Sequence, residues 1–205
     1  METYVLDTNL FFNMEANMGI GNDTETIIRN MTTIIKNSKD NLKFIMPPRI
    51  VEEIKSFFDN PEQEFLKDFF AEITVKSPNL GELMINAHVI AEYIEESRKR
   101  AYRSQDVAEE EIKQAGTMFM GKEALPQKEF QMAIGKIIKN FRSRYRNALR
   151  TGFIDSLADF DLIMLAKEQN ATLVSTDEGV IQWGRKLGVK EIAPSVLGKK
   201  MQAYL

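Results

Sequence analysis

Five aspartates stand where a folded chain could bring their carboxyl groups together. Asp7 and Asp177 each follow a short apolar run of the kind that forms a buried strand. In an open parallel sheet, ligands bind beyond the carboxyl ends of the strands, so these two acids would share one edge. Asp155 and Asp159 are four residues apart and would stack on one helical face if the helix has begun by Asp155. Asp161 would point away from them on a regular helix and joins the group only if the helix start is irregular.

With this composition, carboxylates are the groups that could carry out chemistry. The chain has no cysteine and one histidine, His88, which excludes a thiolate zinc site, a cysteine nucleophile and a multi-histidine metal site. Clustered carboxylates repel one another unless a divalent cation lies among them, and oxygen ligands suit Mg²⁺ or Mn²⁺. Such a metal could activate a water for attack on a phosphodiester. Each aspartate taken alone also fits a turn or a helix cap, so the coincidence of several at one edge carries this interpretation.

The elements that must position these acids alternate along both flanks of the chain. Strands are predicted at residues 4–6, 43–46, 172–176 and 191–193. Helices are predicted from Thr24, from the prolines at 47–48, from Pro61, around 157–166, over 178–187 and at the C-terminal end. This alternation predicts an α/β fold with a parallel sheet flanked by helices.

A different pattern occupies residues 79–150. Apolar residues recur at helical spacing over 80–94 and again over 130–149, and residues 116–126 join the two segments. Two long amphipathic helices with a short connector predict an antiparallel hairpin inserted between 1–78 and 151–205, which form one domain. The apolar run 118–120 at the hairpin tip would be exposed in a monomer, which indicates either a contact with a partner or a tip folded back on itself.

The inserted hairpin is basic although the whole chain carries a net charge of −3. Residues 98–150 contain thirteen Lys and Arg against six Asp and Glu, a net charge of +7, so the rest carries −10. Arg142, Arg146 and Arg150 recur every four residues and form a ridge, with Arg144 to one side. Arginines along a rod suit the phosphates of a folded RNA, and a merely solvated helix face is the alternative interpretation.

Length and composition fit one globular domain with an insertion. The chain has 205 residues, of which 43% are hydrophobic and 28% charged. No apolar run approaches the ~20 residues that span a bilayer, and the N-terminus lacks the pattern of a signal peptide. We therefore expect a cytoplasmic protein without a membrane partner.

Three motifs carry a resemblance to PIN-domain metal-dependent nucleases: VLDTN at 5–9, PPRIVEEI at 47–54 and DFDLIMLAKEQNATLVSTDEG at 159–179. The longer segment DSLADFDLIMLA at 155–166, the basic insertion and the length resemble the small protein-only RNase P group called HARP, the homologues of the Aquifex RNase P. That resemblance implies removal of the 5′ leader from precursor tRNA without an RNA subunit. It also implies dimers that assemble into a dodecameric homo-oligomer, with the hairpin on the tRNA elbow.

The resemblance also implies roles for particular residues. Asp7, Asp155, Asp159 and Asp177 would be the metal-binding, catalytic acids, with Asp161 in a second tier. Glu53 stands where PIN domains commonly supply another acid, but the adjacent Glu52 leaves the register open. Thr8, Asn9 and Thr176 could orient the acids by hydrogen bonds or simply form turns.

Two other functions fit the same residues. The first is a PIN-domain endoribonuclease with another RNA target, although such proteins are usually shorter and lack a long basic hairpin. The second is a non-catalytic RNA-binding partner protein that keeps the acids for structure. Substitution of Asp7 by Asn separates these classes, because a catalytic acid is needed for cleavage and a structural one for stability.

Overall fold

The computed structural model describes residues 1–121 and 123–205, and the chain divides into two compact units. The first, here named the sheet unit, consists of Met1–Ile85 and Gly152–Leu205; the second, the hairpin unit, is Asn86–Thr151. Their boundaries fall at 85/86 and 151/152, where the sequence predicts 78/79 and 150/151. Lys122, one of the bases counted in the hairpin, lies outside the described residues.

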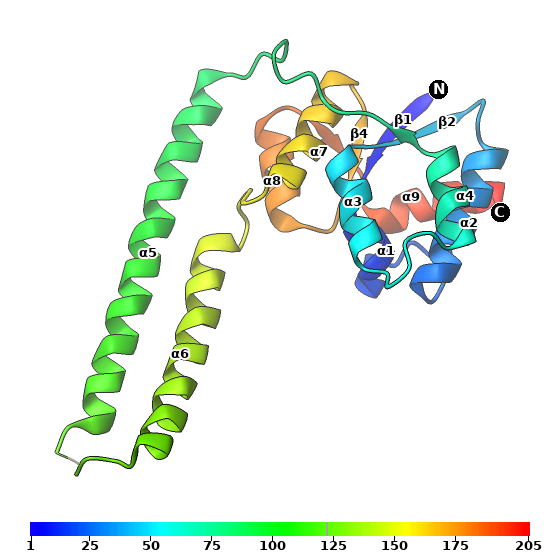
Figure 1. Cartoon of the computed structure of the whole chain (residues 1–205). Helices are drawn as coiled ribbons and strands as arrows, with labels where there is room; N and C mark the ends of the chain where they lie inside the picture. The colour runs from blue at the N-terminus through cyan, green and yellow to red at the C-terminus, as the bar shows by residue number, and fades with distance from the viewer. Residues whose placement is uncertain (122) are drawn as a thin grey trace. The chain divides into compact units, whose positions relative to one another are not determined.

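A five-stranded parallel sheet organises the sheet unit (Figure 1). The strands are β1 (Glu2–Leu6), β2 (Leu42–Met46), β3 (Thr74–Val75), β4 (Thr172–Val174) and β5 (Lys190–Glu191), in the spatial order β3-β2-β1-β4-β5. The central strand β1 pairs Tyr4 with Phe44 on one side and with Thr172 on the other. The predicted α/β fold with a parallel sheet is confirmed, and the carboxyl ends of β1 and β4 lie at one edge.

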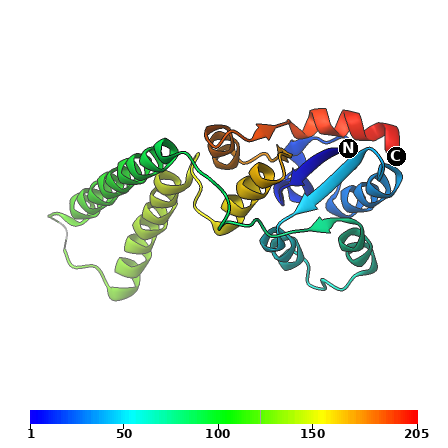
Figure 2. The same ribbon diagram turned by 90° about the horizontal axis from the view of Figure 1, so that it is seen from above.

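Helices lie on both faces of this sheet (Figure 2). They are α1 (Asn9–Phe12), α2 (Thr24–Asn37), α3 (Pro48–Ser56), α4 (Glu64–Glu72), α7 (Leu157–Glu168), α8 (Glu178–Lys186) and α9 (Pro194–Met201), with 3-10 turns at Met14–Ala16 and Gln202–Tyr204. Local chemistry sets their starts: Asp23 caps α2 by accepting from the Thr26 amide at 2.9 Å, and Pro48 is the first residue of α3.

Helix α7 is buried along most of its length and holds the acids of its first turns in place. The five consecutive residues Leu162–Ala166 are all buried, as expected of a helix that is apolar on every side. This helix packs against β1, β4, α3 and α8. Because such a helix cannot rotate without opening the core, Asp159 and Asp161 are delivered in fixed directions.

The predicted ends of two strands in the sheet unit are wrong, and the helix predicted from Pro61 begins only at Glu64. Strand β4 ends at Val174 instead of residue 176, because the Ser175 side chain turns to Asp7 and to the amide of Asp177. The last strand occupies Lys190–Glu191 instead of residues 191–193. Both shifts occur at strand ends, where side-chain contacts compete with the ladder.

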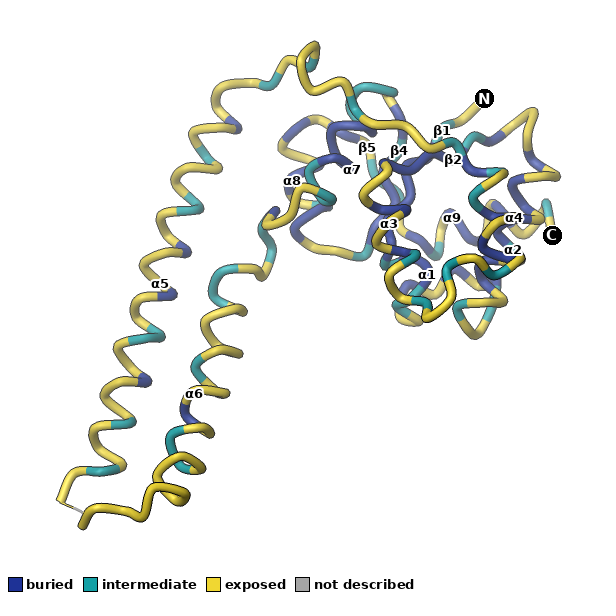
Figure 3. The backbone as a smooth tube through the Cα atoms, viewed as in Figure 1, coloured by how far each residue is buried: buried dark blue, intermediate teal, exposed yellow. Residues whose placement is uncertain are grey.

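The hairpin unit consists of two long antiparallel helices packed side by side, α5 (Ala87–Phe119) and α6 (Gln127–Arg150) (Figure 1). Along α5 the buried residues recur on one face, as Figure 3 shows by colour. The predicted helical stripe over 80–94 is wrong in its first part, because α5 begins only at Ala87, where Asn86 accepts from the His88 amide at 2.9 Å. None of the described helices is long and apolar enough to cross a membrane.

Candidate active site

Asp7 lies at the carboxyl end of the central strand and is almost fully buried, with 4% of its surface exposed. Ser175 donates a hydrogen bond to its Oδ2, and the Asn9 side-chain amide lies 3.4 Å from the same oxygen. The pKa of the Asp7 carboxyl is raised to about 6, mainly by burial and also by the charges of Asp159 and Asp177, while the hydrogen bond from Ser175 lowers it. Asp7 is therefore a costly buried charge with two acidic neighbours.

Asp159 occupies the first turn of α7, where its amide donates to the capping hydroxyl of Ser156 at 3.0 Å. Burial raises the pKa of its carboxyl to about 6 as well. The nearby charges of Asp177, Asp155 and Glu53 add to this shift. The charges that act on Asp7 and Asp159 come from one another's surroundings, so five acids lie within electrostatic reach at the carboxyl edge of the sheet. We call this group the acidic edge; it consists of Asp7, Glu53, Asp155, Asp159 and Asp177.

Asp155 and Asp177 belong to this edge but are held differently from the sequence expectation. Because α7 begins at Leu157 after its cap Ser156, Asp155 lies before the helix, and the predicted helical stacking with Asp159 does not occur. Asp177 caps α8, since its Oδ1 accepts from the Val180 amide at 2.9 Å. The capping role and a place at the acidic edge thus coexist in one side chain.

The structure distinguishes Glu53 from its neighbour Glu52. Glu53 Oε2 accepts a hydrogen bond from the Thr8 hydroxyl at 3.0 Å, and its charge acts on Asp159. Glu52 pairs instead with Lys55 at 3.1 Å. The register that the sequence left open therefore places Glu53 at the acidic edge.

Asp161 is not brought into the acidic edge. It lies on the regular part of α7, is 4% exposed, and its Oδ2 accepts from Nη1 of Arg49 on α3. This is the direction that a regular helix gives to a residue two positions after Asp159. The side chain therefore joins α7 to α3 as an ion pair.

Ser175 is the polar residue of the site that sequence reasoning missed. Its hydroxyl donates to Asp7 and accepts from the amide of Asp177 at 2.9 Å, so one buried side chain links two acids. Thr176, one of the residues that the sequence offered for this role, accepts a hydrogen bond from Asn13 at 3.5 Å. A serine two residues before an acid at a strand end is a known turn-forming pattern and was the available signal.

The candidate RNA-binding arginines of the hairpin unit fall into two groups. Arg144 bridges from α6 to α5, where Glu111 lies 2.7 Å away and Glu110 is a second partner. Arg142, Arg146 and Arg150 are exposed along α6. The first two line a surface groove of 560 Å³ together with the aromatic rings of Phe141 and Tyr145. Arg144 thus joins the two helices of the hairpin, and Arg142, Arg146 and Arg150 lie on the exposed surface of α6.

Comparison with known families decides the relationship of this chain. Residues 3–205 match the family of PINc domain ribonucleases. The chain belongs to that family. The match extends over both parts of the sheet unit and the hairpin between them, so the insertion is part of the matched region.

Individual relatives of this PINc domain ribonuclease are RNA-free ribonucleases P. The enzyme of Thermococcus kodakarensis is 33% identical over 202 residues, which are 98% of this chain and 95% of that protein. That of Thermodesulfovibrio yellowstonii is 36% identical over 190 residues, 93% of this chain and 88% of that protein. That of Hyperthermus butylicus is 31% identical over 213 residues, with 100% and 89% covered. The predicted resemblance to the protein-only RNase P group is confirmed.

Nucleases of the PIN type generally depend on divalent metal ions, and the acidic edge fits such an ion by its chemistry. Among residues 1–121 and 123–205, no three His, Cys, Asp or Glu side chains converge closely enough to enclose an ion as they stand. Burial is the main cause of the raised pKa values of Asp7 and Asp159, and repulsion by neighbouring carboxylates adds to it. Oxygen-only donors with uncompensated negative charge are what a hard divalent cation requires.

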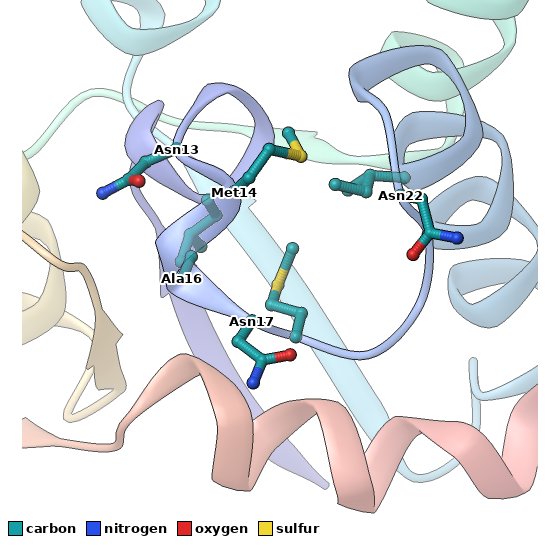
Figure 4. A pocket seen from close by; sticks show the side chains of 9 residues that line it. Asn13, Met14, Ala16, Asn17 and Asn22 are labelled. Atoms are coloured by element: carbon teal, nitrogen blue, oxygen red, sulfur yellow. The ribbon is translucent and has the colours of Figure 1, made fainter.

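A small cavity lies among residues of the segment that follows β1. Its volume is 160 Å³, about the size of a cavity that holds one six-membered ring. Five of its lining residues are labelled in Figure 4: Asn13, Met14, Ala16, Asn17 and Asn22. Asn13 connects it to the edge, because its amide contacts the Thr176 hydroxyl beside Asp177. The loop after β1 therefore forms one wall next to the acids.

Proposed function

We propose that this PINc domain ribonuclease is an endoribonuclease of the RNase P type. It removes the 5′ leader from precursor tRNA by hydrolysis of one phosphodiester and leaves the mature 5′ end, without an RNA subunit. One observation carries the proposal: acids from several elements lie within electrostatic reach of one another at one sheet edge, in a chain that matches RNA-free ribonucleases P over nearly its whole length. We place this activity in the cytoplasm, where its transcript substrate is made.

Within this function, Asp7, Asp155, Asp159 and Asp177 hold Mg²⁺, for which Mn²⁺ substitutes. The bound cation supplies an activated water and stabilises the negative charge that develops at phosphorus. Oxygen donors and raised pKa values support this assignment.

The protein's own groups keep these acids in place. Ser175 orients Asp7 and the turn at Asp177, so both carboxylates keep their direction when the substrate arrives. Thr8 holds Glu53 at the rim of the same edge by a hydrogen bond of 3.0 Å. Asp161 contributes through Arg49 and not as a ligand, because its carboxylate is already paired.

The hairpin binds the body of the tRNA in this proposal. Arg142, Arg146 and Arg150 contact backbone phosphates, as a ridge of exposed guanidinium groups along one helix suits the shape of folded RNA. Arg144 contributes indirectly by joining α6 to α5.

Assembly into dimers and then a dodecamer, which the family resemblance implies, is part of the same proposal. Large apolar side chains on the hairpin support it, since Ile94 is 56% and Ile112 is 71% exposed. At the tip, Met120 is exposed and Phe119 packs on Phe130 with ring centroids 5.2 Å apart. Part of the tip therefore folds on itself while the rest is available for a contact.

The test is a cleavage reaction on a 5′-labelled precursor tRNA with Mg²⁺ or with EDTA, mapped to single nucleotides. One cut at the leader junction that requires the metal and disappears in Asp7→Asn is the expected result. Cuts scattered over the RNA would instead indicate a PIN-domain endoribonuclease with another target. RNA binding without any cut would indicate a non-catalytic partner protein.

A further inference from the structure

An ion pair between α3 and α7 combines a buried acid with an exposed base. The Asp161 side chain is 6% exposed, whereas that of its partner Arg49 is 54% exposed. A carboxylate in this position needs a cation and keeps it, because removal of the partner would leave a buried charge. The guanidinium carries five N–H donors, and the bond to Asp161 uses one of them. The guanidinium of Arg49 is therefore held by Asp161 on one side and exposed to solvent on the other.

The pair lies in a groove at the carboxyl edge of the sheet. The groove has a volume of 430 Å³ and is lined by Pro48, Arg49, Glu52, Ser77 and Asp161. Pro48 follows the end of β2 and Ser77 follows the end of β3, so the groove opens on the same edge as the ends of β1 and β4.

The groove adjoins the acidic edge through both helices that form it. Glu53, which belongs to the acidic edge, is one helical turn after Arg49 on α3. Asp159 precedes Asp161 by two residues on α7. Arg49 and Glu53 therefore lie on the same face of α3, separated by about one helical turn, ~5.4 Å, along the helix axis.

We propose that Arg49 binds the phosphate next to the one that is cut, with Asp161 as its positioning residue. This inference rests on the proposed cleavage of RNA at the acidic edge. The acids repel an approaching RNA strand, and a fixed guanidinium beside them offsets that repulsion for the flanking phosphate. Arginine also matches phosphate geometry with paired N–H donors. Glu52 in the same groove is directed to Lys55 at 3.1 Å.

Two competing roles for the ion pair predict different results. If the pair is purely a structural link between α3 and α7, its loss would lower the stability of the protein. The dependence of cleavage on each flanking phosphate would then stay the same. As a metal ligand, Asp161 would affect the concentration of Mg²⁺ needed for cleavage and leave the phosphate contacts unchanged.

The experiment uses precursor tRNAs that carry one neutral methylphosphonate at each position flanking the leader junction. In the wild-type protein, one such substitution is expected to slow cleavage roughly tenfold, the usual size of a lost charge-assisted hydrogen bond. Arg49→Gln is expected to slow cleavage of the natural substrate by a similar factor and to lose sensitivity at that same position. Equal sensitivity in wild type and Arg49→Gln at every position would overturn the proposal.

The matched control is Arg29→Gln, on α2 of the same unit. Its side chain is 56% exposed and pairs with Glu25 at 2.7 Å, so it loses the same charge and the same kind of partner. This variant is expected to keep the wild-type response at every methylphosphonate. If Arg29→Gln lost its sensitivity to the methylphosphonate as fully as Arg49→Gln, the effect would come from net charge alone. That result would refute a specific contact of Arg49.

Asp161→Asn tests the positioning role, and a double variant protects the test against misfolding. Asp161→Asn is expected to reduce the effect of the methylphosphonate on cleavage without changing the Mg²⁺ dependence. A shifted Mg²⁺ dependence with an unchanged methylphosphonate effect would refute the positioning role.

If Arg49→Gln lowers the melting temperature, the double variant Arg49→Gln with Asp161→Asn removes the unpaired buried charge. The double variant is expected to melt at a higher temperature than Arg49→Gln and to remain insensitive to the methylphosphonate. Absence of any leader cut by the wild type would refute the proposed function instead.

Discussion

The sheet unit and the hairpin unit both gather charged side chains, but they do so in opposite ways. At the acidic edge, acids of one sign surround Asp7, which has only 4% of its surface exposed, while Glu53, Asp155 and Asp177 are exposed. In the hairpin unit, buried charges are paired with opposite ones, as Glu111 is with Arg144 at 2.7 Å. The first arrangement stores electrostatic repulsion that a cation can relieve, whereas the second stabilises the helix pair. Chemistry is thus expected in the sheet unit and binding in the hairpin unit.

Part of the hairpin's net positive charge is used inside the hairpin itself and does not face RNA. Arg100 is buried, donates to the Leu149 carbonyl at 3.1 Å and pairs with Glu96 at 3.1 Å, so it serves the packing of α5 on α6. Arg144 does the same from the other helix. The charge of +7 over residues 98–150 therefore overstates the surface that meets RNA. The exposed arginines of α6 remain the candidates for that surface.

Substitution of Asp7 by Asn is expected to have the largest effect. Loss of a metal-binding carboxylate should lower the cleavage rate by about a thousandfold or more while the affinity for precursor tRNA changes little. Single-turnover cleavage and filter binding of the same variant measure both quantities. If the variant still cuts at a rate within tenfold of the wild-type rate, the acidic edge is not the site of the reaction.

The stability of the metal-free protein is expected to depend on pH through the same residue. The folded pKa of Asp7 is about 6 and its ordinary value is 3.8, so between these values the folded state binds the proton that the unfolded state has lost. The free energy of unfolding should therefore rise as the pH falls from 7 to 4, by roughly 2 to 3 kcal/mol from this group. Asp159 acts in the same direction.

Urea unfolding of wild type and Asp7→Asn across this pH range, with the metal chelated, measures that contribution. The variant should be more stable than the wild type at pH 7, and the difference should vanish near pH 4. A variant that is less stable at every pH would show that Asp7 is a structural acid, which contradicts the contrast between the two units.

Replacement of Ser175 by Ala is expected to have an intermediate effect. The hydroxyl links Asp7 to the turn at Asp177, so its loss should lower the cleavage rate roughly tenfold without a change in RNA affinity. Thr176→Ala is the matched control, because its hydroxyl makes only one contact, with Asn13 at 3.5 Å. Similar rates for the two variants would remove Ser175 from the site.

The smallest effects are expected in the hairpin unit. Substitution of Arg142 and Arg146 by Gln should weaken binding of precursor tRNA several-fold and lower the slope of log affinity against log salt by up to about two. Arg144→Gln should instead lower the melting temperature, because Glu111 would lose one of its partners. Salt titrations and thermal melts of both variants sharpen the comparison, and a salt slope reduced by Arg144→Gln alone would reverse the two roles.

The sequence predicts the acids at strand ends well, and the reason is geometric. Asp7 and Asp177 follow apolar runs that form parallel strands, and all parallel strands of a sheet end on one side. The direction of Asp161 follows from helical periodicity once α7 is regular. These positions depend on local patterns that a single chain reveals.

The hydrogen-bond and ion-pair partners of the site residues could not be predicted in the same way. Glu52 and Glu53 are adjacent and chemically alike, and only the position of Thr8 after β1 distinguishes them. Ser175 and Arg144 likewise acquire their roles from residues distant along the chain. Hydrogen bonds and ion pairs between elements depend on side-chain directions that are fixed only when the elements pack.

Cleavage of a precursor tRNA with a single phosphorothioate at the leader junction tests most directly whether the acidic edge cuts that phosphodiester through a divalent cation. Sulfur binds Mg²⁺ poorly and Mn²⁺ better, since softer ligands favour the later metal. We predict slow cleavage of this substrate in Mg²⁺, recovery in Mn²⁺, and no cleavage by Asp7→Asn in either metal. Cleavage at the natural rate in Mg²⁺ for both sulfur stereoisomers, or a cut by Asp7→Asn, would contradict the assignment.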